Sequence, residues 1–167
     1  MNIILNQTDE AVFFEKLANL DLSMVKMKVL KESHYNQELV DEMADWYKKF
    51  LFLNFKYPDL KIVPNDLIDE FWHQHILDTQ SYWVDCNTLF GYFLHHFPYF
   101  GLRGEDDRQN LNRAYEETKM LFISEFGELP FMTKGIQELL ANLPAESMAA
   151  AKAASCSDCS GAAGTGT

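Results

Sequence analysis

The sequence is poor in the features that mark several large classes of protein. It has three cysteines, an odd number, and two of them lie close to the C-terminus, so they make no disulfide framework. No uninterrupted apolar stretch approaches the roughly 20 residues that a helix needs to cross a bilayer. With 14 basic and 25 acidic residues, the net charge of −11 leaves no basic patch for the phosphates of a nucleic acid. We therefore expect neither a disulfide-rich secreted domain, nor a membrane protein, nor a nucleic-acid-binding protein.

Residues 1–6 also lack the basic region and the long apolar run of a signal peptide. At 167 residues the chain is long enough for one hydrophobic core and short for two domains. Its 13 Phe, 7 Tyr and 3 Trp can bury a large area, which argues against disorder along most of the chain. We expect a soluble cytoplasmic protein with a single helical domain over residues 1–144.

Apolar residues recur at three- and four-residue steps through most of the chain, which is the pattern of amphipathic helices. A first helix is predicted to be capped by Asn6 or Thr8 and to end near Leu20. Residues 21–34 suit either a helix followed by a loop, which we favour, or a short strand.

Two asparagines mark the starts of the next helices. One helix is predicted to begin at Asn36 and to stop before Pro58. The next is predicted to begin at Asn65 and to run to about Cys86. A shorter helix is expected over residues 88–96.

Residues 101–104 are expected to form a loop, after which Asp106 or Asp107 caps another long helix, and a short helix follows over residues 133–143. The pattern predicts an all-α fold, an irregular or orthogonal bundle of about five to six helices.

The composition changes abruptly over residues 145–167, where Ala, Ser and Gly dominate and aromatic residues are missing. Such a segment cannot bury enough surface to offset its ordering entropy, so we predict that it is disordered. Its pair Cys156 and Cys159 could capture a soft metal, form a local disulfide or have no role. No role is favoured, because a structural zinc site needs further ligands.

Four of the five histidines lie within residues 73–96, among aromatic side chains. Imidazole is the commonest metal ligand in proteins and carries protons near neutral pH, so chemistry is expected here. Side chains two apart on a helix diverge by about 200°, so His73 and His75 face opposite sides. His75 shares the apolar, inward side with Asp78 and Tyr82, and His73 lies on the far side with Asp69.

An interior site is therefore predicted from His75 and Asp78, with His95 or His96 contributed by the following helix. Nitrogen and oxygen ligands of this kind would suit zinc or non-haem iron. The candidate metal ligands are His73, His75, Asp78, His95, His96 and Asp69. The candidate cofactor-binding residues are Trp72, Tyr82 and Cys86.

Two other interpretations of the histidine cluster stay open. It could be a purely structural polar network, because Asp78 or Tyr82 would satisfy the ring of His75. It could also be a metal-free ligand pocket or an acid–base site. The sequence contains no H-E-x-x-H motif, no glycine-rich phosphate loop and no G-x-S-x-G elbow, so no catalytic residue is assigned and enzymatic activity is left open.

The string W-H-Q-H-I-L-D-T over residues 72–79, followed by Tyr82, Asp85 and Gly91, resembles the glycine-rich domain-containing protein-like family. The Ala/Ser/Gly tail looks like a reduced form of the endings that some members carry. The family is uncharacterised, so the resemblance implies no reaction or cofactor. It implies that Trp72 and the residues that follow it form one recurring unit.

The sequence therefore predicts a helical protein with a His/Asp/aromatic interior site that binds a transition metal or a small molecule. The alternative is a protein-interaction module in which the histidine network only rigidifies the core. In that case the partner would be a protein that contacts the tail, residues 145–167, or the aromatic surface.

Overall fold

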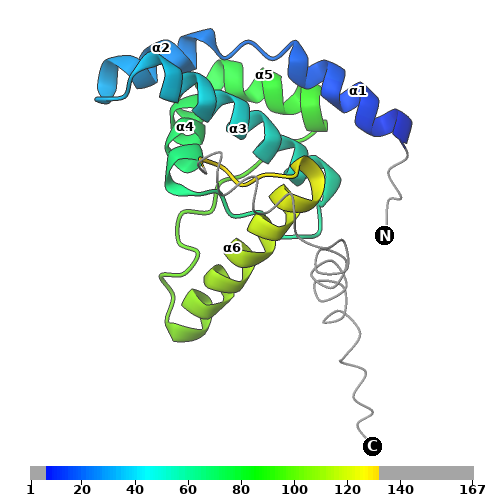
Figure 1. The fold of residues 1–167 in the computed structure, drawn as a ribbon, viewed down its shortest axis with the longest axis vertical. Helices are drawn as coiled ribbons and strands as arrows, with labels where there is room; N and C mark the ends of the chain where they lie inside the picture. The colour runs from blue at the N-terminus through cyan, green and yellow to red at the C-terminus, as the bar shows by residue number, and fades with distance from the viewer. Residues whose placement is uncertain (1–6, 132–167) are drawn as a thin grey trace, which may run out of the picture. The chain divides into compact units, whose positions relative to one another are not determined.

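The computed structural model describes residues 7–131, and within that range every regular element is an α-helix (Figure 1). The all-α fold is therefore confirmed. The helices are α1 (Gln7–Ala18), α2 (Ser23–Glu32), α3 (Gln37–Lys56), α4 (Asp66–Leu77), α5 (Thr79–Phe90) and α6 (Glu105–Phe126). Within residues 7–131, none of these helices combines the length and the apolar character needed to cross a bilayer.

The chain divides into two compact units, one ending at Tyr115 and the other beginning at Glu116, so the division falls inside α6. The second unit, as far as it is described, continues α6 to Phe126, with Thr118, Phe122 and Ile123 buried. The single domain expected for residues 1–144 stays a prediction. The predicted helix over 133–143 and the predicted disordered tail over 145–167, with Cys156 and Cys159, lie outside the described residues.

The first unit is built around α3, which packs against α1, α2 and α4, while α5 packs against α1 and α4 (Figure 1). The apolar stripe of α3 is broad because it faces three neighbouring helices, and its large side chains fill the centre of the core. The buried residues of α3 are Val40, Met43, Ala44, Trp46, Tyr47, Phe50, Leu51, Phe52 and Leu53.

The predicted asparagine caps are confirmed. The side-chain oxygen of Asn36 accepts a hydrogen bond from the amide of Leu39, and that of Asn65 accepts one from the amide of Ile68. Residues 23–32 form a helix, as favoured over a strand. Thr8 lies inside α1 and does not cap it, while Asn6 lies outside the described residues.

The prediction of one helix from Asn65 to Cys86 was wrong, because the chain leaves the helical conformation at Asp78 (φ −83°, ψ 72°). Asp78 ends α4 and caps α5, its carboxylate accepting a hydrogen bond from the amide of Ser81 at 3.3 Å. Aspartate competes for backbone amides in this way, so it favours helix starts over helix interiors. The apolar periodicity continues through the break and hides it.

The helix predicted over residues 88–96 was also wrong. The helix α5 ends at Phe90, and Gly91 follows with φ 76°, the left-handed conformation that terminates helices. Residues 93–97 are neither helix nor strand. Pro98 disfavours the helical conformation in the residue before it, so a helix is not favoured in this segment. His95 and His96 therefore lie on an irregular segment.

The loop over residues 101–104 is confirmed, and α6 begins directly after it at Glu105. Neither Asp106 nor Asp107 caps this helix, because both lie within its first turn. The carboxylate of Asp107 instead accepts hydrogen bonds from the amides of Gly101 (2.7 Å) and Arg103 (3.2 Å). Gly101 is required there: its φ is 89°, and a Cβ atom would lie 2.5 Å from a methyl group of Leu111.

Candidate metal centre

Two ligands of the candidate centre come from one face of α4. Asp69 and His73 are four residues apart, so their side chains lie one above the other on the helix surface. The Nδ1 atom of His73 is 3.5 Å from Oδ2 of Asp69. Both side chains are partly exposed, so an ion from solution can reach them.

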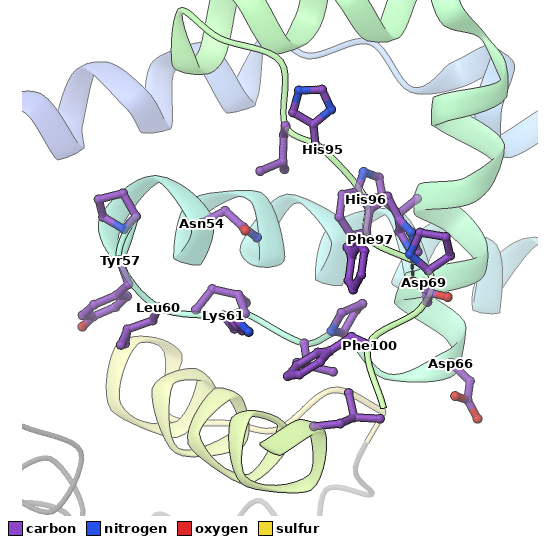
Figure 2. Close-up of a pocket in the computed structure, with 18 of the residues that line it drawn as sticks. Asn54, Tyr57, Leu60, Lys61, Asp66, Asp69, His95, His96, Phe97 and Phe100 are labelled. Carbon is purple, nitrogen blue, oxygen red and sulfur yellow. Dashed lines mark hydrogen bonds and ion pairs between the residues drawn. The ribbon is translucent and has the colours of Figure 1, made fainter. Parts of the chain in front are cut away.

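The third ligand comes from the irregular segment that follows α5. The Nε2 atom of His96 is 3.0 Å from Oδ1 of Asp69, and the rings of His96 and His73 have their centroids 4.5 Å apart. Figure 2 shows His96 pointing toward Asp69 across the space between the segment and α4. One ligand atom from each of the three residues lies within 4.8 Å of the others.

These separations are those expected around a metal ion. Two ligand atoms that each bind a metal at about 2.1 Å, with an angle of about 90° to 110° between the bonds, are about 3.0 to 3.4 Å apart. The distances from Asp69 to the two imidazoles, 3.0 Å from Oδ1 and 3.5 Å from Oδ2, are close to this spacing. The three ligand atoms lie within 4.8 Å of one another, so the geometry allows Asp69, His73 and His96 to hold one ion if the side chains draw closer together.

A chain of contacts holds His96 in place. Its ring packs on the ring of Trp72, with centroids 4.7 Å apart. The indole Nε1–H of Trp72 donates to the hydroxyl of Tyr82 at 2.9 Å, and that hydroxyl donates to the carbonyl of Leu94 at 2.6 Å. Tyr82 thus ties α5 both to α4 and to the backbone two residues before His96.

His75 lies on the opposite, inward side of α4 and is buried. Its Nδ1 atom is 2.9 Å from the hydroxyl of Tyr47, and its Nε2 atom is 3.0 Å from Oδ2 of Asp85. Burial lowers the pKa of His75, and the hydrogen bond to Asp85 opposes that effect in part. A neutral ring that donates from Nε2 to Asp85 and accepts from Tyr47 at Nδ1 satisfies every group in the network.

The predicted pairing of His75 with Asp78 was wrong, because Asp85 occupies that place. The prediction assumed a continuous helix, and the break at Asp78 changes the direction of everything that follows it. Tyr47 could not be identified from the sequence, since it belongs to the apolar stripe of α3 and no spacing relates it to the histidines.

The remaining predicted residues lie apart from the centre. Cys86 is buried, and burial raises the pKa of its thiol, so it stays protonated beside Tyr82. His95 is exposed and directed away from His96 and Asp69 (Figure 2), with its ring 4.9 Å from that of Phe93. Neighbouring residues of a non-helical segment point to opposite sides, which explains why only one of the two histidines reaches α4.

A groove of about 640 Å³ runs beside Asp69 and His96. It lies between the end of α3, the connection from Tyr57 to Pro64, the segment that carries His96, and Leu111 of α6 (Figure 2). Trp72, whose ring packs against that of His96, also lines the groove. The centre therefore opens onto a cavity and not only onto bulk solvent.

Residues 15–119, more than half of the chain, match the model of the UCP032817-like family. The chain belongs to the UCP032817-like family. This finding overturns the resemblance to the glycine-rich domain-containing protein-like family, since the W-H-x-H string that suggested it lies inside the matched range. All three candidate ligands also lie inside it, but the name UCP032817-like states no activity. No curated protein and no solved structure matches the chain.

Proposed function

We propose that this UCP032817-like protein binds one divalent transition metal ion, zinc or iron, through Asp69, His73 and His96. The observation that carries the proposal is the convergence of three ligand atoms within 4.8 Å from two separate segments of the chain. The two histidines would bind as neutral imidazoles and Asp69 as a carboxylate.

The chemistry of the three candidate ligands indicates which type of metal centre they would form. Two imidazoles and one carboxylate, with further positions open, are typical of non-haem iron(II) sites and of catalytic zinc sites. Structural zinc sites instead use four protein ligands, usually with cysteine. The one described cysteine, Cys86, is buried next to Tyr82. A bound ion would therefore keep positions for water or for a ligand that enters from the groove.

Metal binding can be tested with single-site variants. Protein purified without a metal-affinity tag would be titrated with Co²⁺, whose visible spectrum reports its ligands, and with Zn²⁺ in competition. We expect one ion per chain, and a loss of affinity of at least about tenfold in each of Asp69→Ala, His73→Ala and His96→Ala. His95→Ala is the matched control, because His95 adjoins His96 in sequence and points away from the centre.

The alternative for these three residues is a polar cluster without a metal, in which Asp69 is hydrogen-bonded to His96 and lies 3.5 Å from His73. Under that alternative, Asp69→Ala and the wild-type protein would take up the same substoichiometric amount of metal, which would refute the proposal. Circular dichroism of each variant would establish that it folds.

A protein-interaction module remains the second prediction. It depended largely on residues 145–167, which lie outside the described residues. Comparison of the proteins captured by the chain with and without this segment would test it, and identical sets would remove the tail from consideration.

A further inference from the structure

The groove beside the candidate metal centre has the size and lining of a small-molecule site. Such sites enclose about 300 to 1,000 Å³ and are mostly apolar, with a few polar groups that orient the ligand. The volume here is about 640 Å³, and aromatic rings and prolines line much of it. The apolar lining residues include Tyr57, Pro58, Pro64, Trp72, Phe97 and Phe100.

Lys61 is the one lysine or arginine among the residues that line the groove. Its Nζ atom lies 4.5 Å from the centroid of the Phe100 ring, so the ammonium group sits over an aromatic face of the groove. The acidic lining residues, Asp66 and Asp69, belong to α4, where the candidate metal centre lies. The groove therefore has a cationic position on one wall and the candidate metal centre at α4.

We propose that the groove binds a small organic carboxylate with an aromatic or apolar body. The carboxylate pairs with Lys61, the body packs against the rings of Phe97 and Phe100, and the far end is directed toward Asp69 and His96. The orientation of the far end depends on the proposed metal site, whereas binding of the carboxylate and its body does not.

Other ligand classes fit this groove less well. A phosphate group is usually bound by several donors, such as paired arginines or a helix N-terminus, and the lining offers a single ammonium group. The net charge of −11 also repels polyanions more strongly than it repels a singly charged ligand. A single carboxylate attached to an apolar body matches the one ammonium group, that of Lys61, and the apolar walls.

The binding test uses full-length, metal-free protein and two probes that differ only in charge, 3-phenylpropanoate and 3-phenylpropanamide. Titration calorimetry and NMR shift changes would measure affinity and location. We expect the carboxylate to bind more tightly, with Lys61→Gln lowering its affinity about two- to fivefold, as for exposed ion pairs, and leaving the amide unchanged. The control Lys31→Gln removes the same charge from α2, outside the groove, and should alter neither affinity.

Failure of this inference can be distinguished from failure of the proposed function. Metal binding without binding of either probe, or equal affinity for the two probes, would overturn the inference and leave the metal site standing. Probe binding that Lys61→Gln weakens, in a protein that takes up no metal, would support the groove and refute the metal site.

The orientation can be tested in protein loaded with Co²⁺, which broadens the NMR signals of nearby protons. We expect the ring protons of bound 3-phenylpropanoate to be broadened more than the methylene protons next to the carboxylate. The reverse order would place the carboxylate on the metal and overturn the assigned role of Lys61.

Discussion

Replacing Tyr82 by phenylalanine removes one oxygen atom from the interior and leaves the ring in place. That oxygen accepts a hydrogen bond from Nε1–H of Trp72 and donates one to the carbonyl of Leu94. The Tyr82 side chain is 1% exposed, so water does not reach its hydroxyl. The substitution therefore breaks two hydrogen bonds without opening a large cavity.

The loss in the free energy of unfolding can be worked out from these two hydrogen bonds. A typical intramolecular hydrogen bond contributes about 0.5 to 1.5 kcal/mol net, and a buried donor left without a partner costs about 1 to 3 kcal/mol. Trp72 is buried, so its N–H group keeps that penalty, while the half-buried backbone at Leu94 can turn to water. We expect Tyr82→Phe to lower the free energy of unfolding by about 2 to 3 kcal/mol.

We expect Tyr82→Phe also to weaken metal binding at the candidate centre. The bond from Tyr82 to the Leu94 carbonyl, which holds the segment of His96 against α5, acts beside the contacts of His96 with Trp72 and Asp69 of α4. Without the bond to the Leu94 carbonyl His96 samples more positions, and we expect the Co²⁺ affinity of the folded protein to fall about tenfold, as when partners of metal ligands are removed. Urea unfolding and Co²⁺ titration would measure the two effects in the same preparation.

Tyr99→Phe is the matched control, because the Tyr99 side chain is 61% exposed and loses only a hydroxyl that water can solvate. It should change the free energy of unfolding by less than about 0.5 kcal/mol. Equal stability of Tyr82→Phe and Tyr99→Phe would refute the hydrogen-bond reasoning. A destabilised Tyr82→Phe with unchanged Co²⁺ affinity would refute the role of Tyr82 in positioning His96.

Burial lowers the pKa of His75 below its ordinary value of 6.5, so the unfolded chain takes up the proton first as the pH falls. The free energy of unfolding should therefore decrease as the pH falls below about 6.5, and His75→Gln should flatten that slope in urea unfolding between about pH 5 and pH 7. Gly91→Ala places a side chain at φ 76° and should cost about 1 kcal/mol in urea unfolding, and unchanged stability would contradict the left-handed cap. Asn65→Ala removes the cap of α4 and should cost about 1 kcal/mol by thermal unfolding, whereas Asn65→Ser should restore most of it.

Much of the fold is predictable because it depends on residues close together in the chain. Asn36 and Asn65 cap helices through amides three residues away, and the apolar stripe of α3 has the helical period. The break in the helix at Asp78 was not predicted, because two local signals disagree there. Its carboxylate competes for a nearby amide, but the apolar pattern runs on through it, and periodicity alone cannot weigh one against the other.

The residues of the candidate centre also fall into those that the sequence predicts and those that it does not. The sequence by itself determined that Asp69 and His73 share a face of one helix and that His75 faces the other way, because these relations follow from the helical repeat. Only the tertiary structure decided that His96, and not His95, completes the group, and that His75 pairs with Tyr47 and Asp85. These choices depend on where an irregular segment and two other helices pack, which no local spacing in the chain specifies.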